Sequence, residues 1–296
     1  MDLDLDRVLS NTRKGQWSVD DFDWSRPLEG AGDLSPRARR EAGLALLFTA
    51  GLERQAARIF GLCADYADDD RAADIYRLFG ADERRHAAAE IQLAARYGVS
   101  WDDQPATIRW MFRTLARNFD PPTRGAYELA SAIILLFELA LDSILIPALK
   151  ERIGDPLQAE VFRRIDLDES RHLAMDYWLL DRKGAAFAGR SLRDLLEQLE
   201  GTLTTGQRIR GRIALWRSMV ALLVGFGTSA VTLRALSRQL NDPAKIERYL
   251  RRVDSVPEKA PRALDVHAYR MGLRGQRIIL SAMARITRTP VRSARA

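Results

Sequence analysis

The five-residue pattern Asp-Glu-x-Arg-His occurs twice in this 296-residue chain and contains two of its three histidines. One copy places Glu83 and His86 three residues apart, and the other places Glu169 and His172 at the same spacing. Residues three apart on an α-helix share a face, so each copy can direct a carboxylate and an imidazole to one point. Such oxygen and nitrogen ligands suit Fe²⁺ and Mn²⁺. The repeat therefore indicates a metal site with two similar halves.

Two further glutamates lie where helical hairpins bring them beside the repeated pattern. Glu53 precedes the first turn signal, near Asp68, by the same length of chain as Glu83 follows it. Glu138 and Glu169 flank the second turn signal in the same way. Antiparallel helices that rise equally from a turn bring such residues to one depth, about 22 Å from the loop. Each hairpin thus has the order Glu, turn, Glu-x-x-His.

Both added glutamates lie in apolar sequence, where a lone carboxylate is costly or takes up a proton. Glu138 lies within AIILLFELALDSIL, and Glu53 lies within LALLFTAGLERQAARIF. Two divalent ions remove this cost, because their positive charges balance the four carboxylates. We therefore expect six metal ligands, which are Glu53, Glu83, His86, Glu138, Glu169 and His172.

Four other residues of the repeated pattern can support these ligands from outside. Asp82 and Asp168 each precede a ligand glutamate, and each can accept the second N–H of a ligand histidine and so fix its tautomer. Arg85 and Arg171 each precede a ligand histidine and can pair with these aspartates. Each half of the site is therefore expected to have its own outer layer.

The elements that must position these residues are helices, because no stretch alternates with period 2 for long enough to indicate a strand. Ser35-Pro36 is typical of a helix start, and Gly154-Asp155-Pro156 is typical of a turn. We expect long helices over about residues 36–66, 70–97, 124–153 and 157–182, a short helix over about 105–118, and further helices over about 190–240, 243–253 and 262–286. The chain is therefore expected to be all-α.

This plan resembles the ferritin-like di-iron carboxylate proteins, which place one Glu on each of two helices and Glu-x-x-His on each of the other two. The word Asp-Glu-x-Arg-His is similar to that of the bacterial multicomponent monooxygenase hydroxylases, and the acyl-carrier-protein desaturases carry related words. The resemblance covers about residues 37–182. It implies that Glu83 and Glu169 bridge two metal ions, with Glu53 and His86 completing one site and Glu138 and His172 the other.

The resemblance also implies a division of the chain into four parts. These are an irregular N-terminal lead (1–35), a ferritin-like di-iron four-helix bundle (36–182), additional helices packed on the bundle (183–286) and a basic tail (287–296). Because this fold often dimerises, a homodimer is an open alternative to a monomer.

The activity that the resemblance implies is that of an O₂-dependent oxidase or oxygenase with two iron ions, or with a Mn/Fe pair. It would hydroxylate or desaturate an organic substrate, including an acyl chain bound to a carrier. Glu90 stands where ribonucleotide reductase radical subunits usually carry a tyrosine, which argues against that role. The chain has one cysteine, Cys63, and no flavin motif, so a reductase or ferredoxin is expected to supply electrons.

Two other classes of function stay open. One is a ferroxidase or iron-binding protein without an organic substrate, although the long segment 183–296 after the fourth long helix favours a substrate channel over a storage cage. The other is a helical interaction protein that binds an acidic partner.

Asp142 lies one turn beyond Glu138 on the same helical face, near the point where monooxygenases and desaturases often place a threonine. We consider it the candidate catalytic residue outside the ligand set. It can act as an extra ligand, as a proton donor or as a hydrogen-bond partner of a ligand histidine. The alternative is an ordinary ion pair between helices.

The charge of the chain is uneven. Residues 1–181 carry 23 Lys and Arg against 32 Asp and Glu, whereas residues 182–296 carry 23 against 8. A basic C-terminal third suits an acidic partner such as a carrier protein, an electron donor or an anionic membrane, and we expect no nucleic acid. Arg208, Arg210 and Arg212 are the candidate contacts for an acidic carrier. A solvated arginine-rich surface is the alternative.

The most apolar run, residues 218–233, contains two glycines, a serine and a threonine within its apolar sequence. It is too short for a helix that spans a membrane, which needs about 20 apolar residues. We therefore expect a buried core helix, with peripheral membrane contact as the alternative. The single cysteine and the acidic N-terminus without a signal-peptide pattern favour the cytoplasm.

Overall fold

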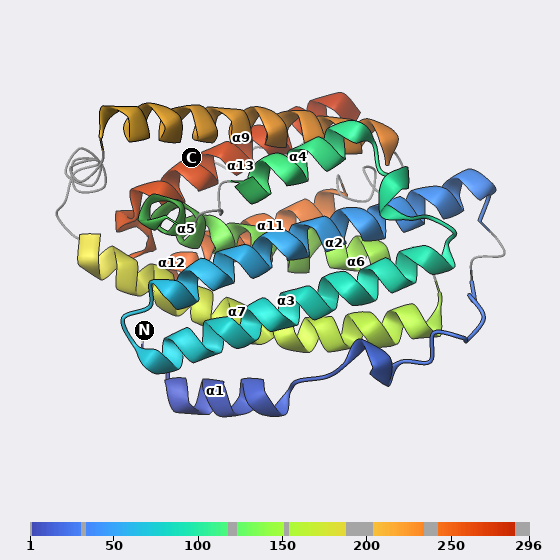
Figure 1. The fold of residues 1–296 in the computed structure, drawn as a ribbon, viewed down its shortest axis with the longest axis horizontal. Coiled ribbons are helices and arrows are strands. Elements are labelled where there is room, and N and C mark those ends of the chain that lie inside the picture. Colours follow the sequence, from blue (N-terminus) through green and yellow to red (C-terminus); the bar gives the residue numbers. More distant parts are fainter. Residues whose placement is uncertain are drawn as a thin grey trace.

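The computed structural model describes residues 2–30, 34–117, 123–150, 154–187, 204–233 and 242–287. Throughout these ranges the regular structure is helical and contains no strand, as Figure 1 shows. The expected all-α class is therefore confirmed.

The first hairpin consists of α2 (Pro36–Asp65) and α3 (Asp70–Arg96). Ser35 caps α2, because its hydroxyl accepts a hydrogen bond from the Ala38 N–H, and Pro36 occupies the first turn. Asp69 caps α3 by accepting from the first backbone N–H groups of that helix. These local signals determine where each helix begins, and so they fix the depth of Glu53 and Glu83 below the turn.

The second hairpin consists of α5 (Arg124–Ala140), a π-helical segment η4 (Leu141–Leu145), α6 (Ile146–Lys150) and α7 (Pro156–Phe187). Helix α2 packs against α3 and α5, and α7 packs against α3 and α5. The third long helix was expected to run unbroken to residue 153, and the π-helical segment interrupts it. A π-helix bonds i to i+5 and is most often found as a single turn inside an α-helix, frequently at functional sites.

The N-terminal lead was expected to be irregular, and this prediction is wrong. It contains α1 (Leu5–Lys14) and the short 3₁₀ helix η1 (Val19–Asp21). Helix α1 begins at its cap Asp4 and buries Leu5, Leu9 and Thr12, which share one face. It packs against α3 and α7 on the side of the molecule opposite α9 (Figure 1).

Helix α9 (Thr205–Thr232) covers α4 (Ala106–Ala116), which follows the 3₁₀ helix η2 (Trp101–Asp103). A Cβ atom at Gly225 would lie 2.2 Å from Met111 Sδ, so the close approach of α9 to α4 requires glycine there. The apolar run 218–233 was expected to form a buried core helix, and only one side of it is buried. Of the helical region expected over about residues 190–240, residues 190–203 and 234–240 lie outside the described residues.

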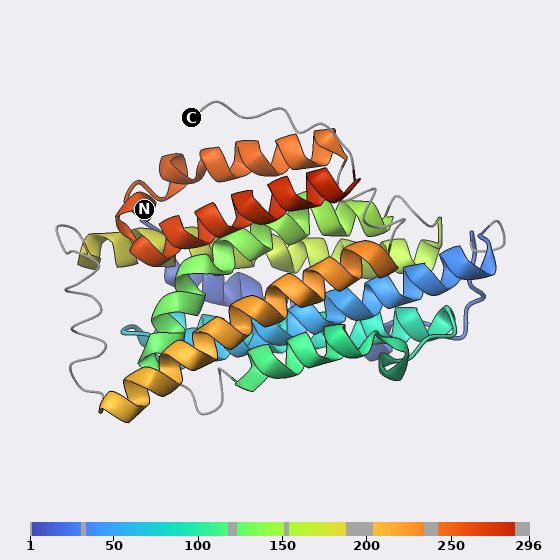
Figure 2. The same cartoon turned by 90° about the horizontal axis from the view of Figure 1, so that it is seen from above.

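The remaining described elements are α11 (Pro243–Asp254), α12 (Val256–Lys259), the 3₁₀ helix η5 (Ala263–Asp265) and α13 (His267–Thr287). They pack on α5, η4 and α7, where Tyr249, Val253 and Tyr269 are buried (Figure 2). Nearly all of the expected basic tail lies outside the described residues. The division into a bundle and added helices stays a prediction.

One helical stretch among the described residues, Arg124–Lys150, is long and apolar enough to cross a membrane by length and composition. The structure buries 72% of its most apolar window. That is the pattern of a core helix, and this stretch carries Glu138 at the centre of the protein.

Candidate metal centre

The structure brings all six expected ligands together in the interior. Their side chains come from α2, α3, α5 and α7, and each residue is at most 1% exposed. Within the described residues, the ligand atoms form two groups, in each of which they lie within 4.8 Å of one another. One group is Glu53, Glu83, His86 and Glu169, and the other is Glu83, Glu138, Glu169 and His172. Because Glu83 and Glu169 belong to both groups, the arrangement can hold two ions side by side.

Many polar atoms of this cluster have no hydrogen-bond partner. Both carboxylate oxygens of Glu83, Glu138 and Glu169 are buried and have no hydrogen-bond partner. The Nδ1 atom of His172 lies 2.9 Å from Glu83 Oε1 and 3.5 Å from Glu169 Oε2, yet it makes no hydrogen bond. Buried polar atoms are normally paired. Atoms that converge without pairing fit a shared cation, so the donor set suits a metal.

The metal-free cluster holds protons where metal ions would sit. Burial raises the pKa of Glu83 and of Glu138 well above the ordinary value, and neighbouring carboxylates raise both further. Burial alone would lower the pKa of His172, but the charge of Glu169 and the contacts with Asp82 and Glu169 raise that pKa to about 9. Since metal ligands must be deprotonated, metal binding would release these protons.

The outer aspartates contact the histidines crosswise. His86 Nε2 donates to Asp168 Oδ2 over 2.9 Å, and His172 Nε2 lies 3.4 Å from Asp82 Oδ2. Each aspartate therefore supports the histidine of the opposite hairpin. The contact assigns the proton to Nε2 and leaves Nδ1 of each ring directed at the carboxylates.

The arginines and the N-terminal lead complete this outer layer. Arg85 forms an ion pair with Asp82, and Arg171 forms one with Asp168. Gln16 donates to Asp82 Oδ1 over 2.9 Å and accepts from Arg85 over 2.8 Å. A Cβ atom at Gly15 would lie 2.8 Å from a guanidinium nitrogen of Arg171, so glycine lets the end of α1 approach it.

Trp17 connects the lead to the ligand layer. Its indole Nε1 donates to Asp168 Oδ2 over 2.8 Å, and its ring stacks on His86 with 6.0 Å between ring centroids. The Arg85 guanidinium lies 5.4 Å from the centre of the same indole. The sequence pattern did not indicate this role, because a single tryptophan far from the repeated words carries no spacing signal.

We expect Trp17→Phe to weaken metal binding by about tenfold, since removing a partner of a ligand-supporting group typically costs 10- to 100-fold in affinity. The substitution keeps an aromatic ring against His86 but removes the hydrogen bond that holds Asp168. Titration of the metal-free protein with Mn(II) measures the effect. Trp24→Phe is the matched control, because the Trp24 indole donates to the Val19 carbonyl and not to the site. Equal affinities for both variants would contradict this role.

Asp142 does not join the ligand cluster. It forms an ion pair with Arg252 of α11, and its side chain is 28% exposed. The reason is the π-helical segment, which begins at Leu141. Its i to i+5 bonding shifts the face that follows Glu138 by a residue, so the α-helical spacing no longer applies. The geometry supports the alternative of an interhelical ion pair and gives no support to a catalytic role for Asp142.

Two buried carboxylates that sequence reasoning missed lie next to the ligands. Glu90 and Asp176 each follow a ligand histidine by four residues, and they are 1% and 2% exposed. Both oxygens of Asp176 and one oxygen of Glu90 have no hydrogen-bond partner. The sequence did contain a signal for these two acids, because an acidic residue follows the histidine by four positions in both copies of the repeated pattern.

These two acids lie on opposite sides of the cluster. Glu90 is near Thr49 and Glu53 of α2, whereas Asp176 is near Cys63, at the other end of that helix. Burial is the largest cause that raises the pKa of each, and Asp176 reaches a pKa of about 8. Both shifts favour the protonated acid in the metal-free protein.

A cavity of about 600 Å³ adjoins the ligand-bearing helix α7. Its wall on that helix consists of Ser170, Leu173, Ala174 and Tyr177, and α11 and α12 add Arg252, Glu258 and Lys259. Lys259 Nζ lies 4.8 Å from the centre of the Tyr177 ring. Ser170 and Leu173 directly follow Glu169 and His172 in the sequence, so the cavity lies beside the ligand face.

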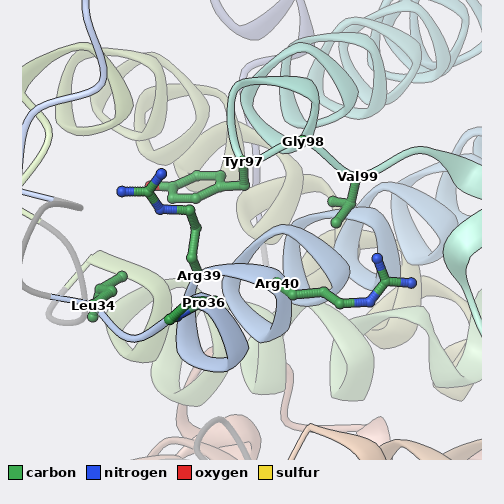
Figure 3. A pocket seen from close by; sticks show the side chains of 7 residues that line it. All are labelled: Leu34, Pro36, Arg39, Arg40, Tyr97, Gly98 and Val99. Atoms are coloured by element: carbon green, nitrogen blue, oxygen red, sulfur yellow. The ribbon is translucent and has the colours of Figure 1, made fainter.

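A second pocket, of about 320 Å³, lies at the far end of the first hairpin. Figure 3 shows it between the start of α2 and the end of α3, with Arg39 and Arg40 pointing to opposite sides. Arg40 pairs with Asp103 over 2.8 Å. Because several turns of α2 separate Arg40 from Glu53, the pocket is about 20 Å from the ligand level. It is therefore separate from the metal centre.

The candidate partner contacts Arg208, Arg210 and Arg212 belong to α9, and the structure does not describe their side chains. Comparison of the chain with protein-family models gives no match, and comparison with curated proteins gives none either.

Proposed function

We propose that the protein is a ferritin-like di-iron oxidase or oxygenase that uses O₂ to hydroxylate or desaturate an organic substrate. The observation that carries this proposal is the pair of ligand groups that share Glu83 and Glu169. A site with two carboxylates common to both halves is suited to two metal ions in close proximity. Four carboxylates balance two divalent ions, and the oxygen-rich donor set with one imidazole for each ion suits iron or manganese.

The packing of the four ligand-bearing helices supports the ferritin-like assignment. Helices α2 and α5 each contribute one glutamate, and α3 and α7 each contribute Glu-x-x-His. This is the ligand plan of the di-iron carboxylate bundles.

A bound iron pair would supply redox chemistry and O₂ activation. The chain itself would bind and orient the ions through the six ligands, with the crossed histidine–aspartate contacts fixing each imidazole. Apolar side chains around the ligands, such as Phe60 and Phe79 near His172, would keep bulk water out. Cys63 is a single buried thiol, so electrons for repeated turnover would come from a separate reductase or ferredoxin.

The cavity beside α7 supports an organic substrate over iron storage. Its volume is in the range of small-molecule sites, and apolar Leu173 and Ala174 of the ligand-bearing helix line it. An acyl chain, free or bound to an acidic carrier, is the substrate class we propose to screen first.

Iron oxidation distinguishes this function from that of a ferroxidase. The metal-free protein is loaded with Fe(II) without oxygen and then exposed to O₂, and bound iron and consumed O₂ are measured. An oxidase should bind about two iron ions per chain. Its consumption of O₂ should stop once this iron is oxidised and resume only when a reductant is added. Continued oxidation of added Fe(II) with growth of a mineral core would instead identify a ferroxidase.

Filling the cavity tests the substrate side of the proposal. Ala174→Trp should leave iron binding and the first oxidation intact but abolish formation of hydroxylated or desaturated acyl product, which mass spectrometry detects. Ala185→Trp is the control, because Ala185 is an exposed residue of the same helix outside the cavity lining. Product formation by Ala174→Trp at the control rate would contradict substrate binding in this cavity.

A further inference from the structure

Helix α9 has two contrasting sides. Ser218, Ala221 and Gly225 are buried on the inward side, where Gly225 lies against Met111 of α4. On the opposite side the large apolar residues are exposed, and Trp216 and Leu223 are 66% and 59% exposed. The described exposed set of α9 comprises Ile209, Ile213, Trp216, Met219, Leu223, Val224 and Val231. Contiguous exposed apolar surface of this kind marks an interaction site.

Helix α13 also has an exposed apolar side. Met271 and Ile278 are 55% and 67% exposed and lie seven residues apart, so they share a face, with exposed Arg274 between them. Figures 1 and 2 show α9 and α13 on the side of the molecule away from α1. We call the exposed sides of these two helices the α9–α13 face.

The charge of this region has one sign. Helices α4, α9 and α13 together contain ten arginines and no aspartate or glutamate. Among the arginines whose side chains the structure describes, two have acidic neighbours on other elements, since Arg109 lies 3.6 Å from Asp102 and Arg277 lies 3.7 Å from Asp254. Arg113, Arg217 and Arg274 are exposed. The partner of this face must therefore offer an apolar environment for the exposed side chains and negative charge for the arginines.

We propose that the α9–α13 face docks on an anionic lipid bilayer. Interfacial helices bury an apolar side at the boundary between headgroups and acyl chains, while arginines pair with anionic headgroups and tryptophan favours the interface. Exposed Trp216 and Leu223 supply the apolar depth, and Arg217 and Arg274 supply the charge. A second copy of the chain fits less well, because a two-fold contact through this face would bring the arginine-rich surfaces together.

Vesicle co-sedimentation of the full chain tests the proposal. We expect binding to vesicles of phosphatidylcholine mixed with phosphatidylglycerol, weak binding to phosphatidylcholine alone, and release by high salt. The variant Trp216→Gln/Leu223→Gln should lose binding by roughly tenfold. The matched control is Leu167→Gln, because Leu167 is 54% exposed but lies on α7.

Charge reversal gives a second, independent arm. Arg217→Glu/Arg274→Glu should also weaken binding by roughly tenfold or more. Arg77→Glu is its control, because Arg77 is an exposed residue of α3. The controls should stay within about twofold of the original protein, a difference well below the effect of one interfacial arginine.

Several results would overturn the proposal. They are absence of vesicle binding, binding that neither double variant reduces, and a dimer that Trp216→Gln/Leu223→Gln dissociates in the absence of vesicle binding. Capture of an acidic acyl carrier protein by this face without vesicle binding would also overturn it. Because metal content is measured separately, failure of lipid docking leaves the proposed di-iron function intact, and the reverse also holds.

Discussion

Loading the metal-free protein with Fe(II) in the absence of oxygen is expected to raise its melting temperature by about 10 °C or more. A ligand present at 1,000 times its dissociation constant stabilises the folded state by about 4 kcal/mol for each site. For a chain of this size, 1 kcal/mol corresponds to about 2–4 °C. The unpaired carboxylate oxygens of Glu83, Glu138 and Glu169 give the physical reason, because a shared metal cation satisfies them together.

Glu169→Ala removes a ligand common to both groups and should abolish most of this rise. Glu160→Ala, on the same helix but on its solvent side, should keep it. Metal analysis of both variants, beside calorimetry with and without Fe(II), gives the comparison. An equal rise in the two variants, or no metal bound by the original protein, would show that the cluster is not a metal site.

The second large effect concerns Asp176. Its pKa rises from 3.8 to about 8 in the folded chain because of burial, so folding favours the protonated form. This contribution to stability is complete below about pH 4 and is lost as the pH rises to about 8, at about 1.4 kcal/mol per pH unit. Asn cannot ionise, and Asp176→Asn should therefore melt higher than the original protein at pH 8 and close to it at pH 4.

Thermal melts of chelator-treated protein across this pH range measure the difference, which should reach about 5 °C or more at pH 8. Asp166→Asn provides the matched control, since Asp166 is a partly exposed residue of the same helix. A difference for Asp176→Asn that does not change with pH would mean that Asp176 is ionised in the folded state.

The gathering of the six candidate ligands could be predicted from the sequence because each step was local. Glu83 and His86 are placed together by one helical turn, and Glu53 is brought level with them by one hairpin whose ends carry clear capping residues. The expected class of metal rests on ligand chemistry alone and stays a prediction. These steps need no knowledge of how the two hairpins pack.

Features that depend on packing between elements could not be predicted. The sequence allowed each aspartate to support a histidine, but only the placement of α3 beside α7 determines that the contacts cross between hairpins. The π-helical segment moved Asp142 away from the cluster, because helical spacing assumes 3.6 residues per turn throughout. The apolar run of α9 was expected to be buried, since composition does not show which side of a helix lacks a covering element.

The crossed contacts determine when the binding site becomes complete during synthesis of the chain. The first hairpin holds Glu53, Glu83 and His86, but the fourth member of that ligand group, Glu169, belongs to the second hairpin. The carboxylate that orients His86 also arrives with the second hairpin. A nascent chain of which only the first hairpin has emerged therefore has an incomplete binding site. Under the proposed function, capture of iron would wait until both hairpins have docked, and an unfinished chain would not hold metal that it cannot yet enclose.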